Sequence, residues 1–243
     1  MSAEKKEPHS HGHHGRPVVL LDLDGTLVDP AGSITGGIAA TLAQHGLPTP
    51  TPEQLRCLVG PPLRTGLLTL EGVTEENVSG LIQDYRAEYW ATGMAASRPY
   101  PGITEALTEL VADHTLAVAT SKPVSAARRL LALQGLDHFF HAVCGASDDE
   151  QAPLPPHGTK VEAISQALAA VGRMSGDPQA PVRQVVMVGD RHYDLDGAAH
   201  HGLPSVGVLW GFAGPGELEA ATAVCADPRD LPAVCRNLQN GVS

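Results

Sequence analysis

Residues 17–29 read PVVLLDLDGTLVD and decide the fold. Val18 to Leu21 is an unbroken apolar run with two β-branched residues, which is typical of a strand buried on both faces of a parallel sheet. The run leads into Asp22 and Asp24, and residues two apart in an extended chain point to the same side. Gly25 then permits a sharp turn. The sequence therefore predicts two carboxylates at the end of a buried strand, where open α/β sheets bind their ligands.

An acidic turn that merely closes the strand is the alternative interpretation of residues 22–26, because Asp-Gly is a common turn dipeptide. Two neighbouring carboxylates repel each other, so a functional pair needs a cation, a shared proton or both. The choice depends on whether other strand ends supply matching groups.

The bulk composition limits the classes of partner and the cellular location that we expect. The chain has 243 residues and a formal net charge of −11, which disfavours nucleic acid and anionic membranes as partners. No apolar run is long enough to span a bilayer, so we expect a cytoplasmic protein, either a monomer or a weak homodimer. The length suits one domain with an insertion, or two small domains. The cysteines are scattered and predict reduced, mostly buried thiols rather than a zinc site (Cys57, Cys144, Cys225 and Cys235).

Two segments precede and interrupt the expected core. Residues 1–16 are polar and His-rich, which predicts a disordered tail; weak binding of a transition metal by its histidines is the alternative. Residues 31–97 contain helical patterns and no strand pattern, with Ser33 as the expected cap of the first helix. An all-helical insert directly after the first strand predicts a cap domain, a mobile lid over the strand end.

Arg64 lies within this insert, in the stiff turn formed by residues 60–64. One interpretation is a substrate-facing loop in which Arg64 clamps an anionic group. The other is an ordinary connection between helices with a surface arginine. The residues alone leave both open.

A second strand end carries groups that suit an anion. The apolar run at 116–119 is followed by Thr120, Ser121 and Lys122, and the next helix begins at Val124. Polar groups at a strand end that faces a helix N-terminus form a ready anion site. A simple helix cap would account for Ser121, but for neither of its neighbours.

Two later positions complete the pattern. Lys160 begins a helix, where a cation opposes the helix dipole and therefore requires a nearby anion. The buried run at 185–188 ends in Asp190, and Asp194 follows in the first turn of the next helix. The alternative for these two acids is a helix N-cap with an acidic first turn.

The alternation of strands and helices predicts an α/β protein: a Rossmann-like, mainly parallel sheet with helices on both faces and no second sheet. The catalytic core would comprise residues 17–30 and 98–243, and the cap domain residues 31–97. A last helix, capped at residues 227–230, is expected to pack on the edge of the sheet.

These motifs together resemble the haloacid dehalogenase-like hydrolase superfamily. The resemblance rests on four ordered motifs, each in the expected context of a strand end or a helix start: Asp22-x-Asp24-Gly25-Thr26-Leu27, Thr120, Lys160 and Gly189-Asp190-x-x-x-Asp194. It extends from Val18 to Leu238. The stretches RPYPG, VATSKP and VGVLWG most resemble the phosphoglycolate phosphatase and beta-phosphoglucomutase-like subgroup, which has a helical cap.

The resemblance implies a mechanism. Asp22 would be the nucleophile that forms an aspartyl-phosphate, and Asp24 the general acid and base. Dehalogenase members lack an acid at this second place, so Asp24 indicates phosphate ester chemistry. Mg²⁺ would be bound by Asp22, the Asp24 carbonyl, Asp190 and Asp194. Lys160 would offset negative charge, while the phosphate would be held by Thr120, Gly25, Thr26, Ser121, Lys122 and Arg64.

The implied activity is a magnesium-dependent phosphatase acting on a small phosphorylated metabolite, such as phosphoglycolate, a sugar phosphate, a nucleotide or a biosynthetic intermediate. A phosphoryl mutase of the same subgroup shares every motif but needs cap cations for a second phosphate, and the insert contains only Arg56, Arg64 and Arg86. A non-catalytic binding protein on the same scaffold is the third alternative. An eroded site would mark it, yet all four motifs are intact.

Overall fold

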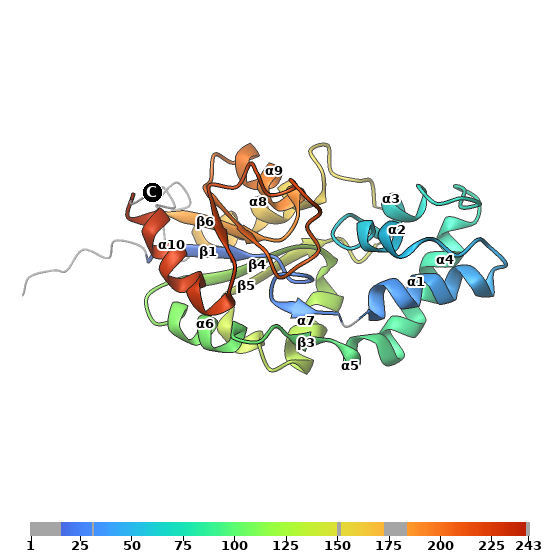
Figure 1. Ribbon diagram of the computed structural model, residues 1–243, viewed down its shortest axis with the longest axis horizontal. Coiled ribbons are helices and arrows are strands. Elements are labelled where there is room, and N and C mark those ends of the chain that lie inside the picture. The colour runs from blue at the N-terminus through green and yellow to red at the C-terminus, as the bar shows by residue number, and fades with distance from the viewer. Residues whose placement is uncertain (1–15, 31, 150–151, 173–183, 242–243) are drawn as a thin grey trace, which may run out of the picture.

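The computed structural model describes residues 16–30, 32–149, 152–172 and 184–241 (Figure 1). At its centre lies a six-stranded sheet in the order β5-β4-β1-β6-β7-β8, and every neighbouring pair of strands is parallel. The strands are β1 (Val18–Leu21), β4 (Thr115–Pro123), β5 (Ala142–Ala146), β6 (Val185–Gly189), β7 (Ser205–Val208) and β8 (Ala223–Cys225). The predicted parallel α/β sheet is therefore confirmed.

Strand β1 shows why the sequence folds in this way. Its side chains alternate between the two faces of the sheet because successive residues of a strand point in opposite directions. Val18 and Leu20 pack in the cluster that contains α8 (Thr159–Gly172) and α9 (His192–His200). Val19 and Leu21 pack in the cluster on the other face. All four side chains are buried, so the strand has to be apolar throughout.

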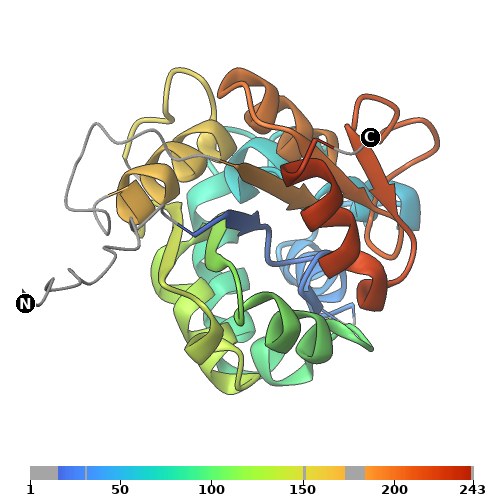
Figure 2. The same cartoon turned by 90° about the vertical axis from the view of Figure 1, so that its left-hand side faces the viewer.

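Helices cover both faces of the sheet. Figure 2 shows α8 and α9 (yellow to orange) on one side of it, with α6 (green) and α10 (red) on the other. The helices on this second side are α6 (Ile103–Leu110), α7 (Val124–Leu133) and α10 (Leu231–Gln239). Two 3₁₀ turns, at Asp137–Phe139 and Pro228–Asp230, precede β5 and α10 respectively. The layers bury the sheet, as the apolar strands require.

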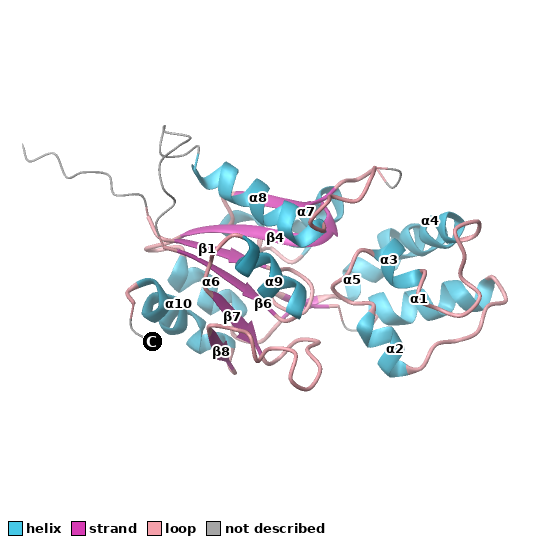
Figure 3. Ribbon diagram, turned by 90° about the horizontal axis from the view of Figure 1, so that it is seen from above, coloured by secondary structure: helices cyan, strands magenta, loops and turns pink. Residues whose placement is uncertain are grey.

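The residues between β2 (Val28–Asp29) and β3 (Arg98–Pro99) form the helical insert, residues 32–97. Figure 3 shows its helices as a group beside the sheet. They are α1 (Ser33–Gln44), α2 (Pro52–Cys57), α3 (Leu63–Leu67), α4 (Val78–Glu88), the π-helix η1 (Tyr89–Gly93) and α5 (Met94–Ala96). Helices α1 and α4 approach closely, since a Cβ atom on Gly37 would lie 3.1 Å from the Tyr85 ring.

The structure corrects two expectations and adds one strand that the sequence analysis did not predict. A second sheet exists, because β2 and β3 pair antiparallel where the chain leaves and re-enters the core; two residues are too few to show a strand period. Strand β8 escaped prediction for the same reason, having only three residues at the sheet edge. Ser33 does not cap α1: Gly32, with a φ of 76°, is the N-cap residue, and no side chain bonds to the helix there.

Three further expectations concern the N-terminal tail, membrane-spanning segments and the last helix. Nearly all of the His-rich tail at 1–16 lies outside the described residues, which begin at Arg16. Among the helices that the structure describes, none is long and apolar enough to cross a membrane. The last helix, α10, contacts β8 at the sheet edge but also α6 and β6.

Candidate active site

The two carboxylates that follow β1 lie at the carboxyl end of the sheet, as their spacing predicts. Asp22 is buried, with 4% of its surface exposed, and its backbone N–H donates to Val188 O at 2.9 Å. This bond fixes the end of β1 against the end of β6, which brings Asp22 close to the residues that follow β6. Gly25 has a φ of 88°, a backbone conformation that favours glycine.

Lys160 lies between the motifs. Its buried ammonium group is 2.7 Å from Asp22 Oδ1 and 2.7 Å from Asp194 Oδ1, and it donates to Ala119 O at 3.0 Å. Burial alone would lower the pKa of Lys160, but the two carboxylates outweigh burial and raise this pKa above its ordinary value. Lys160, at the start of α8, therefore lies beside two anions, as its position at a helix N-terminus predicts.

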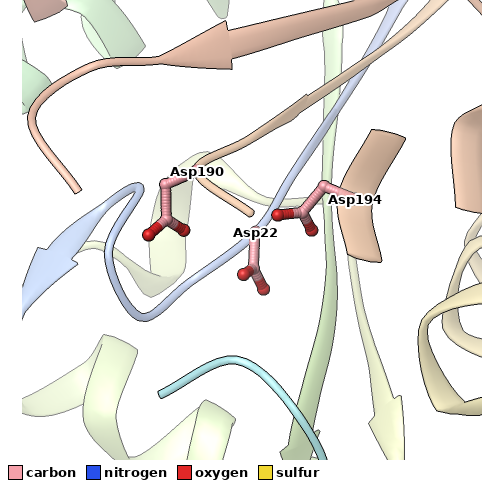
Figure 4. Close-up of side chains that lie close together, drawn as sticks. All are labelled: Asp22, Asp190 and Asp194. Carbon is pink, nitrogen blue, oxygen red and sulfur yellow. The ribbon is translucent and has the colours of Figure 1, made fainter. Parts of the chain in front are cut away.

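Three carboxylates gather around this point. Asp22, Asp190 and Asp194 each offer a carboxylate oxygen within 4.8 Å of the other two, and all three residues are buried (Figure 4). Asp190 is held by Phe212 N–H, which donates to Oδ2 at 2.7 Å. Asp194 accepts from Arg191 N–H at 3.0 Å. Backbone donors thus orient the second and third carboxylates toward the first.

The charges of this cluster do not balance by themselves. Burial, with repulsion from Asp194 and Asp22, raises the pKa of Asp190 to about 8. Burial also raises the pKa of Asp194 to about 6, although Lys160 opposes it. Three hard oxygen donors with too little positive charge around them form a site that a divalent metal ion fits. The cluster could therefore hold such an ion.

Glycine makes this close approach possible. A Cβ atom on Gly25 would lie 2.2 Å from Asp190 Oδ2, and one on Gly211 would lie 2.4 Å from Asp190 Cβ. Thr26 is fully buried and donates from Oγ1 to Asp190 Oδ1 at 3.2 Å. The resemblance implied that Gly25 and Thr26 bind phosphate, but the structure places both beside Asp190, and neither lines the neighbouring cavity.

Asp24 is held by a different cation. Lys122 Nζ lies 2.8 Å from Asp24 Oδ2 and 4.6 Å from the centroid of the Tyr89 ring in the helical insert. The other oxygen of Asp24, Oδ1, is buried and has no hydrogen-bond partner among the described residues. Asp24 thus keeps one oxygen for a group that enters the cavity.

A cavity of about 260 Å³ lies in front of these residues. Its core side is lined by Asp22 and Asp24 and by Thr120, Ser121 and Lys122. Its insert side includes Ile34, Leu58, Leu63, Tyr85, Tyr89 and Trp90. Thr120 is buried, and its Oγ1 accepts from Lys122 N–H at 3.2 Å. The polar strand ends and the apolar insert therefore enclose one common space.

Arg64 does not line this cavity. It pairs with Glu75 and donates to Ser79 Oγ at 3.2 Å on the insert surface. Arg86, which the sequence reasoning did not select, does line the cavity.

Sequence reasoning also missed the aromatic wall and Arg191. Composition carried a signal for the wall, because residues 85–90 contain three of the nine Phe, Trp and Tyr residues in the chain. Arg191 donates to Val59 O in the insert and lies 2.6 Å from Glu217 Oε1. No local pattern indicates this contact, since 132 positions separate Arg191 from Val59.

Several known proteins have sequences similar to this one. The chain is 37% identical over 196 residues to the tyrosine-protein kinase PtkA of Mycobacterium tuberculosis, covering 80% of this chain but only 62% of PtkA. It is 36% identical to a 5′-nucleotidase of Pseudomonas aeruginosa, over 87% of this chain and 91% of that protein. It is 35% identical to a phosphoglycolate phosphatase of Caulobacter vibrioides, over 90% and 91% respectively.

A solved structure shares the fold. A haloacid dehalogenase-like family hydrolase from Streptococcus pneumoniae superimposes with a TM-score of 0.77 and 29% identity, covering 90% of this chain and 98% of that one. Residues 19–208, which include all four ordered motifs, match the haloacid dehalogenase-like hydrolase family. The chain belongs to that family, and its relatives include phosphoglycolate phosphatases.

Proposed function

We propose that this protein is a magnesium-dependent phosphatase that hydrolyses a small-molecule phosphate monoester through an aspartyl-phosphate. One observation carries the proposal: Asp22 and Asp24 line the same cavity, with Asp22 paired to Lys160 and Asp24 Oδ1 left without a hydrogen-bond partner in the part of the chain that the structure describes. A nucleophilic carboxylate and a separate proton donor facing one space are what the transfer and hydrolysis of a phosphoryl group require.

In the first step, an Asp22 carboxylate oxygen attacks phosphorus, and the bond from phosphorus to the ester oxygen breaks. Asp24 gives a proton to that departing oxygen, so that a neutral alcohol leaves. In the second step, Asp24 takes a proton from water while the water oxygen attacks phosphorus. The bond from phosphorus to Asp22 then breaks, which releases inorganic phosphate, restores the Asp22 carboxylate and leaves Asp24 protonated for the next cycle.

The cluster of Asp22, Asp190 and Asp194 would hold Mg²⁺, with the Asp24 carbonyl as a further ligand. When bound, Mg²⁺ supplies positive charge that lets a phosphate dianion approach several carboxylates. The raised pKa values of Asp190 and Asp194 support this assignment, because burial and repulsion between the carboxylates disfavour their charged forms and a cation would offset both effects.

Further residues would hold the transferred group. Lys160 would offset charge on the nucleophile and on the phosphoryl oxygens. Thr120 and Ser121 would bind the phosphoryl group at the end of β4. Residues 17–30 and 98–243 would form the catalytic core, and residues 31–97 a cap domain that closes over it and admits substrate when it opens.

The mutase alternative has less support. A mutase must hold a second phosphate, but Arg64 pairs with Glu75 rather than facing the cavity, which leaves Arg86 as the one cation from the helical insert among the described lining residues. A non-catalytic binding protein is also disfavoured, because such a protein would not need to keep a nucleophile, metal-binding carboxylates and a lysine together in one cluster.

The test is phosphate release from a panel of small phosphate esters. The assay compares Mg²⁺ with chelator, and the wild type with Asp22→Asn. Asp196→Asn, the same substitution at an exposed carboxylate of α9, is the matched control. We expect Mg²⁺-dependent release that is lost in Asp22→Asn and kept in Asp196→Asn. Release that survives in Asp22→Asn would contradict the proposal.

A further inference from the structure

The side of the cavity that faces the departing alcohol is aromatic and apolar. Besides the aliphatic residues Ile34, Leu58, Val59, Pro61 and Leu63, the helical insert contributes Tyr85, Tyr89 and Trp90. The rings of Tyr85 and Tyr89 stack, with centroids 5.8 Å apart and 17° between their planes. A small charged alcohol would leave this wall in contact with water, whereas a ring would cover it.

Trp90 is the ring of this wall that remains half-buried. Arg129, on α7 of the core, lies 4.8 Å from the centroid of the Trp90 ring and also donates to Trp90 O at 3.5 Å. Trp90 lies in the π-helix η1, a rare form that is frequent at functional sites. Because the contacts with Arg129 restrict the Trp90 ring, a ligand that stacks on this ring would cost little further entropy.

The charged groups around the cavity do not favour a second anion. Lys122 is already paired with Asp24, and Arg64 lies outside. Arg86 adds one positive charge to the lining, and Asp148, which accepts from Ser125 Oγ at 2.7 Å, adds one negative charge. Beyond the transferred phosphoryl group, these opposite charges favour an alcohol with no net charge.

From the aromatic wall and this balance of charge we infer that the substrate is the phosphate ester of an uncharged alcohol that carries an aromatic ring, here called a ring-bearing ester, and that Trp90 is the residue that selects it. The shared chemistry is a planar ring on the departing group, which either an aryl phosphate or a nucleoside monophosphate would supply. This inference rests on the proposed function, since it names the class of ester that the same site hydrolyses.

The test measures kcat/KM for four esters: phenyl phosphate, adenosine monophosphate, ribose 5-phosphate and phosphoglycolate. We expect one or both ring-bearing esters to exceed the other two by about tenfold, which corresponds to about 1.4 kcal/mol. The comparison of phenyl phosphate with adenosine monophosphate separates an aryl from a nucleoside substrate. A preference for phosphoglycolate or ribose 5-phosphate would overturn the inference while leaving the phosphatase proposal intact.

Variants test the role of Trp90 through the ratio of kcat/KM for the better ring-bearing ester to kcat/KM for ribose 5-phosphate. Trp90→Ala should lower the preference for the better ring-bearing ester over ribose 5-phosphate by about tenfold, and Trp90→Phe should retain most of it. Leu133→Ala, at an exposed position of α7, is the control and should leave the ratio unchanged. An equal loss of kcat/KM for all esters in Trp90→Ala would mean that the ring is structural and would overturn the inference.

A second variant tests the charge argument without altering the apolar wall. Asp148→Asn should raise kcat/KM for phosphoglycolate relative to phenyl phosphate by about two- to fivefold, because it removes a negative charge from the lining. An unchanged ratio would contradict the argument from charge. Failure of the wild type to release phosphate from any of the four esters would overturn the inference and the proposed function together.

Discussion

Replacing Lys160 by Met tests whether one buried ammonium group holds the site together. Its Nζ lies 2.7 Å from a carboxylate oxygen of Asp22 and 2.7 Å from one of Asp194, and Lys160 is only 6% exposed. Lys160→Met preserves most of the side-chain volume but leaves two buried carboxylates without their partner. Breaking a buried ion pair in this way costs about 3–5 kcal/mol. We expect the free energy of unfolding to fall by that amount in chelator.

The assay is urea unfolding, followed by circular dichroism at neutral pH with chelator present. With a slope of about 2–3 kcal/mol per molar urea, the midpoint should fall by about 1–2.5 M. Arg128→Met, at an exposed position of α7, is the control for loss of a cation and should change the stability by less than about 0.5 kcal/mol.

A double-mutant cycle supplies the refuting result. If the cost of Lys160→Met arises from uncompensated carboxylates, adding Asp194→Asn should recover part of it, with a coupling energy of about 1–3 kcal/mol. Strict additivity of the two substitutions would show that the cost comes from packing. A Lys160→Met protein as stable as the wild type would show that the carboxylates do not need the lysine.

Three other substitutions follow from the same geometry. Gly25→Ala should abolish phosphate release, because its Cβ would lie 2.2 Å from Asp190 Oδ2, and metal-dependent stabilisation should be lost with it. Mg²⁺ at a hundred times its Kd should raise the free energy of unfolding by about 2.7 kcal/mol in the wild type and far less in Asp190→Asn, as thermal melts would show. Partial burial raises the pKa of Glu217, but hydrogen bonds from Gly214 N–H, Arg191 and His192 outweigh it and lower that pKa to about 2. A carboxyl whose pKa is lowered by folding stabilises the folded state at any pH above its pKa in the unfolded state, about 4.3. This stabilisation is lost as the pH falls toward 2. Glu217→Gln should therefore flatten the decline in stability across that window, and an unchanged decline would contradict the assignment.

The positions of the central acids follow from local patterns. An apolar run marks each buried strand, and the residues that follow parallel strands meet at one edge of the sheet, so Asp22 and Asp190 could be placed together from sequence. Lys160 could be placed because a cation at a helix start needs an anion. These deductions rest on residues close in sequence to a strand end or a helix start.

The residues that escaped prediction depend on distant contacts. The donor to Asp190 Oδ2 is the backbone N–H of Phe212, which any residue type except proline could supply. Thr26 forms part of a recognisable motif, yet only the fold shows that its hydroxyl bonds to Asp190 rather than lining the cavity. Arg64 had two open interpretations, and the structure places it with Glu75, an acid that lies in the same helical insert.

The helical insert is tied to the core by cations that also hold core acids. Lys122 pairs with Asp24 while its ammonium group lies over the Tyr89 ring. Arg191, next in sequence to Asp190, pairs with Glu217 while donating to Val59 O. Moving the insert away would remove one partner from each of these buried cations, and unpaired buried polar groups are costly. The position of the insert is therefore energetically coupled to the geometry around Asp24 and Glu217. Through Lys122, Tyr89 in the cavity wall also influences Asp24, the acid that would protonate the departing alcohol.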